Sequence, residues 1–274
     1  MTNIHPSSII EGEVQLAEGV TVGPLCHLIG PITIGAGTTL ISGVHMHGPC
    51  TMGENNLIYP GACIGFAPQD YSFDRETPGS GLVIGDNNTF REHASVHRAT
   101  DPEHPTTLGN HNYLMEQAHV AHDVRMGNHV TMAGSAHLAG HCWVDDHSII
   151  GGVTGIHQFC RIGRGAMAGA CLSYSQDIPP FFSSNVPRAI TGINRIGMRR
   201  LGMSAEEIRV VRDVFNILYR QKLSKKNAVE KLKTRNDHPL IAEYIEFIET
   251  SRRGYSPLVD KHRGSRYEPT ESPD

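Results

Sequence analysis

The sequence predicts a mainly β protein, a left-handed parallel β-helix built from hexapeptide repeats and followed by a small α-helical C-terminal domain. Two observations lead to this fold class. Aliphatic side chains recur at every sixth position through the first two-thirds of the chain, and helical signals begin only after that. The composition agrees, because 29 glycines and an aromatic content of 6% suit short strands and tight turns better than a helical bundle.

The six-residue period is the primary signal. In a β-helix of this type each hexapeptide forms one flat face with one inward side chain, and three faces make a coil of about 18 residues. A β-sandwich would instead alternate with a period of two. The predicted inward residues are Ile10, Leu16, Val22, Leu28, Ile34, Leu40, Met46, Met52, Ile58, Ile64, Ile84, Phe90, Val96, Leu108, Leu114, Val120, Met126, Met132, Leu138, Val144, Ile150, Ile156, Ile162 and Ala168.

Two polar segments interrupt the period, and extra residues cannot stay within a coil of fixed length. We therefore expect external loops near 66–81 and 98–106, on a β-helix that spans residues 1–178. A proline-rich segment then leads to an α-helical domain over residues 179–254. The polar residues 255–274 are expected to form a disordered tail.

Helix start signals divide the C-terminal domain into three predicted helices. Ser204 and Glu207 form a capping box at the start of the first helix. Ser224 opens a short second helix, and Asp237 with Pro239 opens a third. The apolar side of the first helix consists of Ile208, Val211, Phe215 and Leu218.

Composition and patterning also exclude several classes of protein. A formal net charge of −4 is unlike that of a generally basic nucleic-acid-binding protein. The N-terminus carries no cationic and apolar signal segment, and no stretch is long and apolar enough for a transmembrane helix. Six scattered cysteines without a C-x-x-C pair indicate reduced thiols. We therefore expect a cytoplasmic protein that binds no nucleic acid and does not insert into membranes.

The segment HVAHD at residues 119–123 becomes informative once the coil period is known. Side chains one coil apart stack along the helix axis at the strand spacing of about 4.8 Å. His122 is therefore expected beneath Gly140, and Asp123 beneath His141. The residues predicted to converge on this strip of surface are His119, His122, Asp123, Gly140, His141, His157 and Gln158.

Three interpretations of this strip are open. Exposed positions of a β-helix can simply accumulate histidine. The strip can also bind zinc as in the γ-class carbonic anhydrases, which share the fold and use two histidines about five residues apart with a third about two coils earlier. Here the paired histidines, His119 and His122, are closer together, and residues 83–86, two coils upstream, contain no histidine. We therefore favour the third interpretation, one histidine acting as a general base with the others binding a polar substrate, and expect no metal.

Several motifs together carry a resemblance to a known family. HVAHDVRMGN, LAGHCWVDDHSIIGG, IHQFCRIG and SQDIPP, followed by a helical region, resemble the acyl-carrier-protein–UDP-N-acetylglucosamine O-acyltransferases, which catalyse the first step of lipid A biosynthesis. IGFAPQD and REHASVHRAT match the same family. The likeness covers about residues 8–255, with the motifs in the order and spacing of the family.

The resemblance implies an acyltransferase that moves a 3-hydroxyacyl chain from acyl carrier protein to the 3-hydroxyl of UDP-N-acetylglucosamine, without a cofactor. His122 matches the general base of the family, Asp123 the residue that orients it, and Gly140 the glycine whose N–H holds the thioester oxyanion. Ala170 matches the position that limits acyl-chain length. The matching substrate-binding positions are Gln69, Asp70, His119, His141, His157, Gln158, Asn194, Arg199 and Arg200.

The first loop and the arginine pair each depart from the family pattern at one position. Gln69 and Asp70 match a substrate-binding pair that we expect to reach across a subunit boundary. Ser72 stands where the family usually has a lysine, and Leu201 stands where it often has a further basic residue. Both departures concern contacts to the nucleotide sugar.

The charge distribution indicates an acidic macromolecular partner. Residues 188–235 contain 13 Lys or Arg against four Asp or Glu, in a chain whose net charge is −4. An acidic carrier protein is attracted to such a region, although a solvated basic helix face is the simpler alternative. By analogy with other proteins of this fold class, we also expect a homotrimer.

Three alternatives for the activity stay open at this stage. A related acyltransferase can act on another UDP-sugar, such as a 3-amino analogue. A zinc-dependent enzyme of the γ-carbonic-anhydrase type is a second alternative. The third is a non-catalytic binding module, which gives no product from an acyl-carrier-protein thioester and UDP-N-acetylglucosamine.

Overall fold

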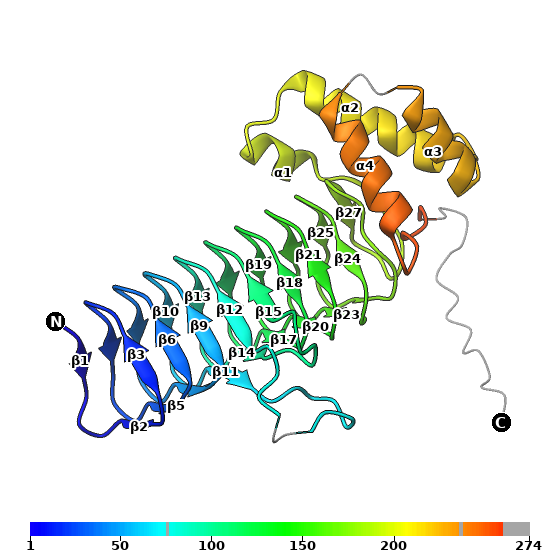
Figure 1. The fold of residues 1–274 in the computed structure, drawn as a ribbon. Helices are drawn as coiled ribbons and strands as arrows, with labels where there is room; N and C mark the ends of the chain where they lie inside the picture. Colours follow the sequence, from blue (N-terminus) through cyan, green and yellow to red (C-terminus); the bar gives the residue numbers. More distant parts are fainter. Residues whose placement is uncertain (75–76, 236–237, 260–274) are drawn as a thin grey trace.

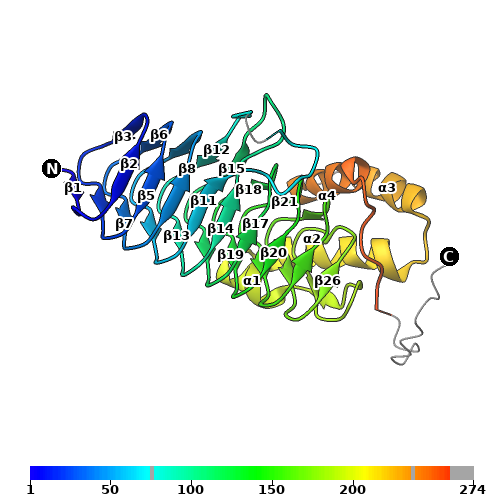
Figure 2. The same cartoon turned by 90° about the horizontal axis from the view of Figure 1, so that it is seen from below.

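A triangular β-helix forms the elongated body of the molecule, and a group of helices covers its C-terminal end (Figure 1). The computed structural model describes residues 1–74, 77–235 and 238–259. Figure 2 shows the coils following one another along the axis, with the helices alongside the last of them. The fold class predicted from the repeats is therefore confirmed.

Three sheets of parallel strands form the three faces of the β-helix. Sheet A contains β1 (Asn3–Ile4), β4 (Thr21–Val22), β7 (Thr39–Leu40), β10 (Leu57–Ile58), β13 (Thr89–Phe90), β16 (Tyr113–Leu114), β19 (Thr131–Met132), β22 (Ile149–Ile150), β25 (Met167–Ala168), β27 (Phe182–Ser184) and the antiparallel β28 (Gly192–Ile193). Sheet B contains β2 (Ile9–Glu11), β5 (His27–Ile29), β8 (His45–His47), β11 (Cys63–Phe66), β14 (Ser95–His97), β17 (His119–Val120), β20 (His137–Leu138), β23 (Gly155–Ile156) and β26 (Ser173–Tyr174). Sheet C contains β3 (Val14–Leu16), β6 (Ile32–Ile34), β9 (Cys50–Met52), β12 (Leu82–Ile84), β15 (Thr106–Leu108), β18 (Arg125–Met126), β21 (Trp143–Val144) and β24 (Arg161–Ile162).

The inward positions predicted from the six-residue period form the core. From Val22 to Ala168, every one of these side chains is at most 4% exposed. The two exceptions lie in the first coil, where Ile10 is 37% exposed and Leu16 is partly buried. Ile10 and Leu16 pack against a following coil on one side only, so burial is complete only from the second coil onward.

Buried asparagines close the corner between sheets C and A. The Oδ1 of Asn56 accepts a hydrogen bond from the backbone N–H of Asn88 at 2.9 Å, and the Oδ1 of Asn88 accepts one from the N–H of Asn112 at 2.8 Å. All three residues are at most 1% exposed. The ladder therefore pairs backbone N–H groups that a turn would otherwise bury without a partner.

Both interruptions of the repeat lie between strands of the β-helix. The first loop lies between β11 and β12, and the second between β14 and β15. The first loop projects from the side of the β-helix (Figure 1). Its base is held by His97, whose Nδ1 donates to the carbonyl oxygen of Ala67 at 2.8 Å.

The helical region begins with a short helix that the repeat analysis did not predict. Its six residues carry no apolar period, so no sequence signal marks them. The helices are α1 (Arg195–Arg200), α2 (Ala205–Phe215), the π-helical turn η1 (Asn216–Arg220), α3 (Lys225–Lys233) and α4 (Pro239–Thr250). No helix among the described residues is long and apolar enough to cross a bilayer.

The predicted helix starts are found at α2, α3 and α4. Ser204 and Glu207 form the reciprocal capping box, and the Ser224 hydroxyl accepts the N–H of Asn227 at 3.2 Å. Helix α4 begins at Pro239 with His238 as its N-cap. The contribution expected from Asp237 falls outside the described residues.

Helix α4 fastens the helical region to the last coils of the β-helix. Arg164 donates to the Glu243 carboxylate at 2.6 Å, and the buried Tyr244 hydroxyl donates to the carbonyl oxygen of Pro180 at 2.7 Å. These contacts join residues that are far apart in the sequence, so the orientation of α4 depends on the β-helix.

The expectation of a disordered tail from residue 255 is wrong for its first five residues. Tyr255 forms a β-bridge with Asp177, and Leu258 forms one with Ile190. Ser256 is fully buried, and its carbonyl oxygen accepts the Tyr219 hydroxyl at 2.9 Å. These residues are held in place despite their polar composition, because their backbone groups pair with other parts of the chain. Residues 260–274 lie outside the described part of the chain.

A row of imidazoles runs along the outer surface of sheet B. The His119 ring lies 5.3 Å from that of His97 and 5.7 Å from that of His137, between centroids. The Nδ1 of His119 forms a 2.8 Å hydrogen bond with the Ser95 hydroxyl. Burial, together with the neighbouring histidines, lowers the pKa of His119 to about 4. His119 is therefore neutral in the folded protein at pH 7.

The depressed pKa of His119 makes folding stability sensitive to acid. In the unfolded chain this imidazole takes up a proton near pH 6.5, whereas in the folded protein it does so only near pH 4. Stability is therefore lost as the pH falls from 6.5 toward 4, by about 2 kcal/mol between pH 7 and pH 5. In urea unfolding, His119→Gln should reduce the loss between these two pH values by about this amount. The same loss in His119→Gln and in the wild type would contradict the assignment, and His129→Gln, at an exposed corner, controls for removing one histidine.

Candidate active site

The corner between sheets B and C brings the predicted site residues together. Asp123, His141 and Phe159 occupy equivalent positions in three successive coils, with φ angles of 60°, 60° and 64°. Asp and His tolerate this left-handed conformation better than most residues. We call this row of residues, together with His122 and Gly140, the catalytic corner.

His122 and Asp123 form a short hydrogen-bonded pair. The distance from the His122 Nδ1 to the Asp123 Oδ2 is 2.6 Å, and the His122 side chain is only 13% exposed. An ionised carboxylate can only accept, so the Nδ1 carries the proton and donates it. In the neutral tautomer that donates from Nδ1, the Nε2 of His122 has a lone pair and can accept a proton from a substrate.

The Asp123 carboxylate is held by the loop that follows β14. It accepts the Thr100 hydroxyl at 2.6 Å, the Thr100 N–H at 3.1 Å and the Asp101 N–H at 3.1 Å. Burial by itself raises the pKa of Asp123, but the hydrogen bonds from His122, Thr100 and Asp101 outweigh it and lower this pKa well below the ordinary value. Asp123 is therefore ionised whenever the protein is folded near neutral pH. Sequence reasoning missed Thr100, because a contact between a loop and a coil leaves no periodic signal.

Gly140 lies against the imidazole of His122, as the coil period predicted. A Cβ atom at position 140 would come within 2.6 Å of the His122 Cε1, so only glycine leaves room for the ring. Among the described residues, none accepts a hydrogen bond from the Gly140 N–H. A free backbone donor therefore adjoins the imidazole, an arrangement suited to binding an oxyanion.

His141 and Phe159 continue the corner beyond the His122–Asp123 pair. The His141 Nε2 lies 3.6 Å from the Asp123 Oδ2, and the His141 ring stacks on Phe159 with centroids 4.6 Å apart. Burial lowers the pKa of His141, although Asp123 opposes this effect. A neutral His141 near pH 7 leaves the negative charge of Asp123 to act mainly on His122.

A groove on the sheet B side of the catalytic corner holds most of the remaining predicted residues. We call it the His122 groove, and its lining includes Gln69, His119, His122, Gly140, His157 and Gln158. Arg188, which the sequence did not single out, also lines it. The Nη2 of Arg253 donates to the Nδ1 of His157 at 2.8 Å. Arg253 comes after α4, and no motif marked it.

Gln69 and Asp70 lie near the histidines of their own chain. Gln69 lines the His122 groove. Hydrogen bonds from Ser72 lower the pKa of Asp70, and His122 and His141 lower it further through their charge. The Ser72 hydroxyl and N–H both donate to the Asp70 Oδ1 at 2.8 Å. The serine that departs from the family pattern thus fixes the carboxylate next to it.

Four predicted residues lie away from both the His122–Asp123 pair and the His122 groove. Asn194 caps α1, accepting the Gly197 N–H at 2.9 Å and donating to the carbonyl oxygen of Gly165 at 3.0 Å. Arg199 and Arg200 form the exposed last turn of α1. Ala170 is exposed at the corner between sheets A and B. These residues lie away from the corner between sheets B and C.

The catalytic corner also contains donor atoms that are close enough for a metal ion. One ligand atom each from His122, Asp123 and His141 falls within 4.8 Å of the others. However, both oxygens of Asp123 already accept hydrogen bonds from Thr100, Asp101 and His122. The donor set therefore fits a hydrogen-bonded Asp–His pair better than a metal centre.

Comparisons with known proteins identify relatives over almost the whole chain. Residues 177–256 match the family model described as UDP N-acetylglucosamine O-acyltransferase, domain 2. The acyl-[acyl-carrier-protein]–UDP-N-acetylglucosamine O-acyltransferase of Halorhodospira halophila is 41% identical over 257 residues, covering 93% of this chain and 99% of the relative. The enzyme of the same name from Paraburkholderia phymatum is 42% identical over 262 residues, with the same coverage.

Solved structures agree with the sequence relatives. The UDP-N-acetylglucosamine acyltransferase of Francisella novicida superposes with a TM-score of 0.89 at 33% identity, covering 94% of this chain and 95% of its own. The UDP-N-acetylglucosamine O-acyltransferase of Moraxella catarrhalis gives a TM-score of 0.87 at 34% identity, covering 92% and 99%. With relatives about 40% identical over 93% of its length, the chain belongs to the family of acyl-[acyl-carrier-protein]–UDP-N-acetylglucosamine O-acyltransferases.

Proposed function

We propose that the protein transfers a 3-hydroxyacyl chain from acyl carrier protein to the 3-hydroxyl group of UDP-N-acetylglucosamine, the first step of lipid A biosynthesis. The observation that carries the proposal is the His122–Asp123 pair facing Gly140, in a chain of this family. The pair supplies a base, and the glycine supplies a backbone donor. Acyl transfer to a hydroxyl group requires both.

The reaction follows from the orientation of the imidazole. The Nε2 of His122 takes the proton of the sugar hydroxyl as the oxygen attacks the thioester carbonyl. The Gly140 N–H donates to the oxyanion that forms, and Asp123 stabilises the imidazolium through the Nδ1–H. The carbon–sulfur bond then breaks, and the departing thiolate takes the proton from His122. The products are the acylated nucleotide sugar and the free thiol of the carrier protein.

The groove residues contribute binding rather than proton transfer. We assign Gln69, Asp70 and Gln158 to the polar groups of the sugar nucleotide, where carboxylate and amide groups form directional hydrogen bonds. His119 is neutral at pH 7 and can accept or donate one hydrogen bond without adding charge. His157 lines the same groove, and we assign it to the nucleotide sugar as well, whereas His141 lies beyond the His122–Asp123 pair, against Phe159.

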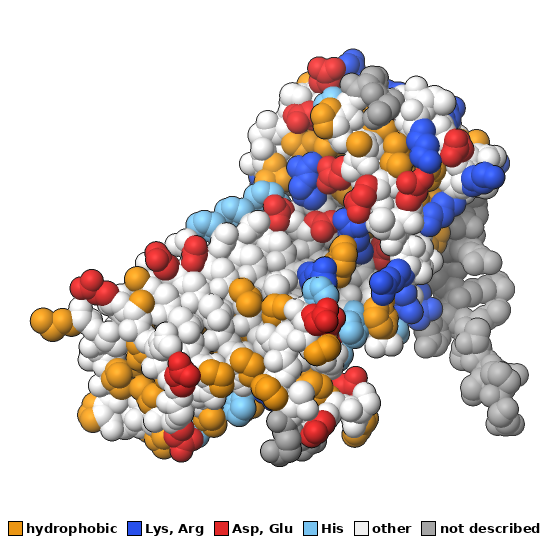
Figure 3. Space-filling view, viewed as in Figure 1, with side chains coloured by type: hydrophobic (Ala, Val, Ile, Leu, Met, Phe, Trp, Pro, Cys, Tyr) orange, Lys and Arg blue, Asp and Glu red, His pale blue; other side chains and the backbone are white. Residues whose placement is uncertain are grey.

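The carrier protein is the expected macromolecular partner of the helical region. Figure 3 shows Lys and Arg side chains on the helices and adjoining coils, interspersed with Asp and Glu, whereas the charged side chains on the visible face of the N-terminal coils are acidic. Residues 188–235 have a net charge of +9, from 13 basic and four acidic residues. An acidic carrier protein is steered toward such a surface, and this attraction weakens with added salt.

A homotrimer brings the separated residues together. Asn194, Arg199, Arg200 and Ala170 lie on other edges of the β-helix than His122. In a ring of three chains packed side by side, these edges of one chain face the catalytic corner of the next. The arginines then suit the pyrophosphate of the nucleotide sugar, and Ala170 borders the acyl chain.

We place this assembly in the cytoplasm, where both substrates are made.

Replacing the proposed base should abolish most of the turnover without unfolding the protein. We expect His122→Ala to lower kcat by about 10²–10⁴-fold, because an unassisted sugar hydroxyl is a poor nucleophile. Asp123→Asn should lower kcat by about 10²-fold, since the amide no longer selects the Nδ1–H tautomer. A mass-spectrometric assay with 3-hydroxyacyl carrier proteins measures both, using UDP-N-acetylglucosamine and its 3-amino analogue as acceptors.

His129→Ala is the matched control for these variants. His129 also occupies a corner with positive φ, but it stacks between His111 and His147 away from the His122 groove. It should keep the wild-type kcat. A fully active His122→Ala enzyme would refute the role of the base. A higher kcat/KM with the 3-amino analogue would instead identify that nucleotide sugar as the acceptor.

The donor cluster of His122, Asp123 and His141 makes zinc-dependent catalysis the second candidate. The acyltransferase mechanism predicts that purified protein contains substoichiometric zinc and that dialysis against a chelator leaves kcat unchanged. A zinc enzyme predicts about one zinc per chain and activity that returns only when zinc is restored. Elemental analysis of the purified protein, before and after dialysis, separates the two.

The trimer proposal predicts complementation between two inactive chains. His122→Ala lacks the base, and Arg200→Ala should have a raised KM for the nucleotide sugar. If Arg200 serves the His122 of a neighbouring chain, random mixing of the two chains should restore about one quarter of the sites. Activity at low nucleotide-sugar concentration, measured after co-expression, tests this. Activity no higher than that of the separate variants would place both residues in the same chain or Arg200 outside the site.

A further inference from the structure

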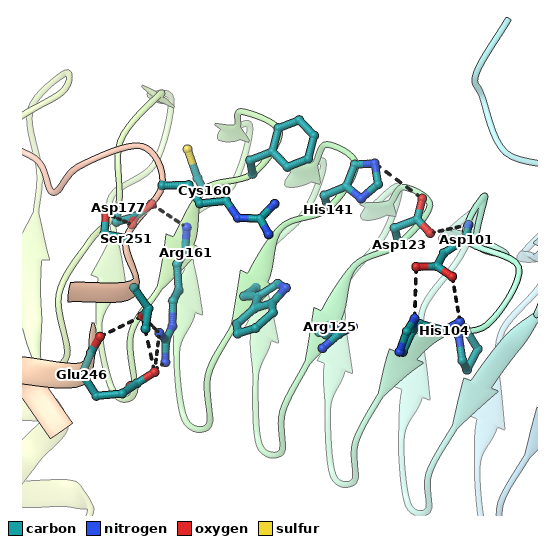
Figure 4. A pocket seen from close by; sticks show the side chains of 15 residues that line it. Asp101, His104, Asp123, Arg125, His141, Cys160, Arg161, Asp177, Glu246 and Ser251 are labelled. Carbon is teal, nitrogen blue, oxygen red and sulfur yellow. Dashed lines mark hydrogen bonds and ion pairs between the residues drawn. The ribbon is translucent and has the colours of Figure 1, made fainter. Parts of the chain in front are cut away.

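The segment after α4 returns to the last coils of the β-helix, and we call its residues 251–256 the strap. The Ser251 hydroxyl donates to the Asp177 Oδ2 at 2.5 Å (Figure 4), and the Ser256 N–H donates to the carbonyl oxygen of Asp177 at 2.8 Å. The Asp177 N–H donates in turn to the carbonyl oxygen of Gly254 at 2.9 Å. Asp177 is only 1% exposed, so one buried residue of the β-helix holds both ends of the strap.

Arg253 reaches from the strap to the wall of the His122 groove. Its Nε donates to the carbonyl oxygen of Ser175 at 3.2 Å, and its Nη2 donates to the Nδ1 of His157 at 2.8 Å. Arg253 is half-buried, and His157 lines the groove. The guanidinium therefore joins a segment near the end of the described chain to a proposed substrate-binding residue.

The Nδ1 of His157 has two neighbours that require opposite states of protonation. The carbonyl oxygen of Gln158, at 3.2 Å, can only accept a hydrogen bond, so it suits an Nδ1 that carries a proton. The guanidinium of Arg253 can only donate, so it suits an Nδ1 with a lone pair. The contact with Arg253 is the shorter of the two, and a charged donor makes the stronger hydrogen bond. Arg253 therefore decides the state of this nitrogen.

The other ring nitrogen of His157 is then a donor. A neutral imidazole whose Nδ1 accepts a hydrogen bond carries its proton on the Nε2. Among the described residues, none forms a hydrogen bond with this Nε2, and the His157 side chain is exposed. The groove therefore presents a free N–H at His157. Without Arg253, the Gln158 carbonyl would favour a proton on the Nδ1, and the Nε2 would become an acceptor.

His122 and His157 are thus held in opposite tautomers within one groove. An acceptor, Asp123, keeps the proton of His122 on the Nδ1 and leaves its Nε2 as a base. A donor, Arg253, keeps the proton of His157 on the Nε2. A substrate in the groove therefore meets an acceptor at His122, which suits a hydroxyl group, and a donor at His157, which suits an oxygen with a lone pair.

The strap does not depend on Arg253 for its attachment. Besides the contacts with Asp177, the carbonyl oxygen of Ser256 accepts the Tyr219 hydroxyl at 2.9 Å, and Leu258 forms a β-bridge with Ile190. These contacts hold the segment on both sides of Arg253. The contact with His157 therefore has a role beyond fastening the strap.

We propose that Arg253 is a positioning residue, which fixes His157 in the Nε2–H tautomer so that His157 donates to an acceptor oxygen of the nucleotide sugar. Arg253 acts through His157 and need not touch the substrate. This inference rests on the proposed function, in which His157 belongs to the nucleotide-sugar site.

The tautomer of His157 can be measured without any substrate. Nitrogen-15 NMR of histidine-labelled protein, at about pH 8.5, distinguishes a protonated ring nitrogen from one with a lone pair, because this pH lies above the ordinary pKa of histidine. The spectrum of His157→Gln identifies the signals of His157. Wild-type protein should carry the proton on the Nε2, and Arg253→Met should carry it on the Nδ1. A proton on the Nδ1 in the wild type, or the same tautomer in both proteins, would overturn the inference.

Calorimetric binding of UDP-N-acetylglucosamine supplies the second arm. Arg253→Met should weaken binding about tenfold, because an acceptor nitrogen then faces an acceptor oxygen. The amide of His157→Gln offers an N–H that does not depend on Arg253. In that background, Arg253→Met should change the Kd by less than about twofold. Effects of the two substitutions that simply multiply would contradict a role through His157.

Arg164→Met is the matched control, because Arg164 also joins the β-helix to the helical region. It donates to Glu243 at 2.6 Å and does not line the His122 groove. Arg164→Met should lower the thermal midpoint but keep the wild-type Kd and the wild-type tautomer of His157. A loss of affinity as large as that of Arg253→Met would reduce Arg253 to a fastening role and overturn the proposal.

The two arms separate this inference from the proposed function. Wild-type protein that binds no UDP-N-acetylglucosamine would contradict the proposed function and, with it, the assignment of the acceptor oxygen. The tautomer, measured in the substrate-free protein, would still decide whether Arg253 controls His157. Circular dichroism and the thermal midpoint establish that each variant is folded.

Discussion

A closed coil of fixed length is the constraint on which the rest of this molecule depends. Each face must present one aliphatic side chain to a narrow interior, so a residue inserted within a face would turn later inward side chains outward. Insertions are therefore accommodated only where the chain leaves the coil, as it does after Phe66 and His97. The same constraint aligns residues of successive coils, so that Gly140 lies against His122 and leaves space for its imidazole.

Asp123 links this scaffold to the proton transfer proposed for His122. It occupies a corner with positive φ, accepts hydrogen bonds from Thr100 and Asp101 in the second loop, and accepts the Nδ1–H of His122. Burial of a carboxylate is unfavourable unless its oxygens are paired, and here the loop supplies the pairing. The second loop therefore has a structural role that its polar sequence does not reveal. It keeps the carboxylate ionised and directs the tautomer of the imidazole.

The repeat made the coils, the inward residues and the stacking at His122 predictable, because periodic burial is a local property. The position of α1 was not predictable, since Asn194 is held by the carbonyl oxygen of Gly165 on a distant corner. The contact of Arg253 with His157 likewise joins a segment after α4 to the β-helix. Polar composition suggested disorder at Ser256, yet tertiary pairing buries it. Sequence reasoning therefore succeeded where spacing carries the information and failed where contacts join separate elements.

The outward row of sheet C, which ends in Arg125, Trp143 and Arg161, shows how a regular scaffold can carry charged and aromatic side chains without changing its fold. Outward positions have no packing role, so Arg125 and Trp143 can be replaced or acquired without disturbing the core. Register then places them beside Asp123, because neighbouring coils are fixed at the strand spacing. The His122–Asp123 pair can therefore stay constant while the outward residues beside it change.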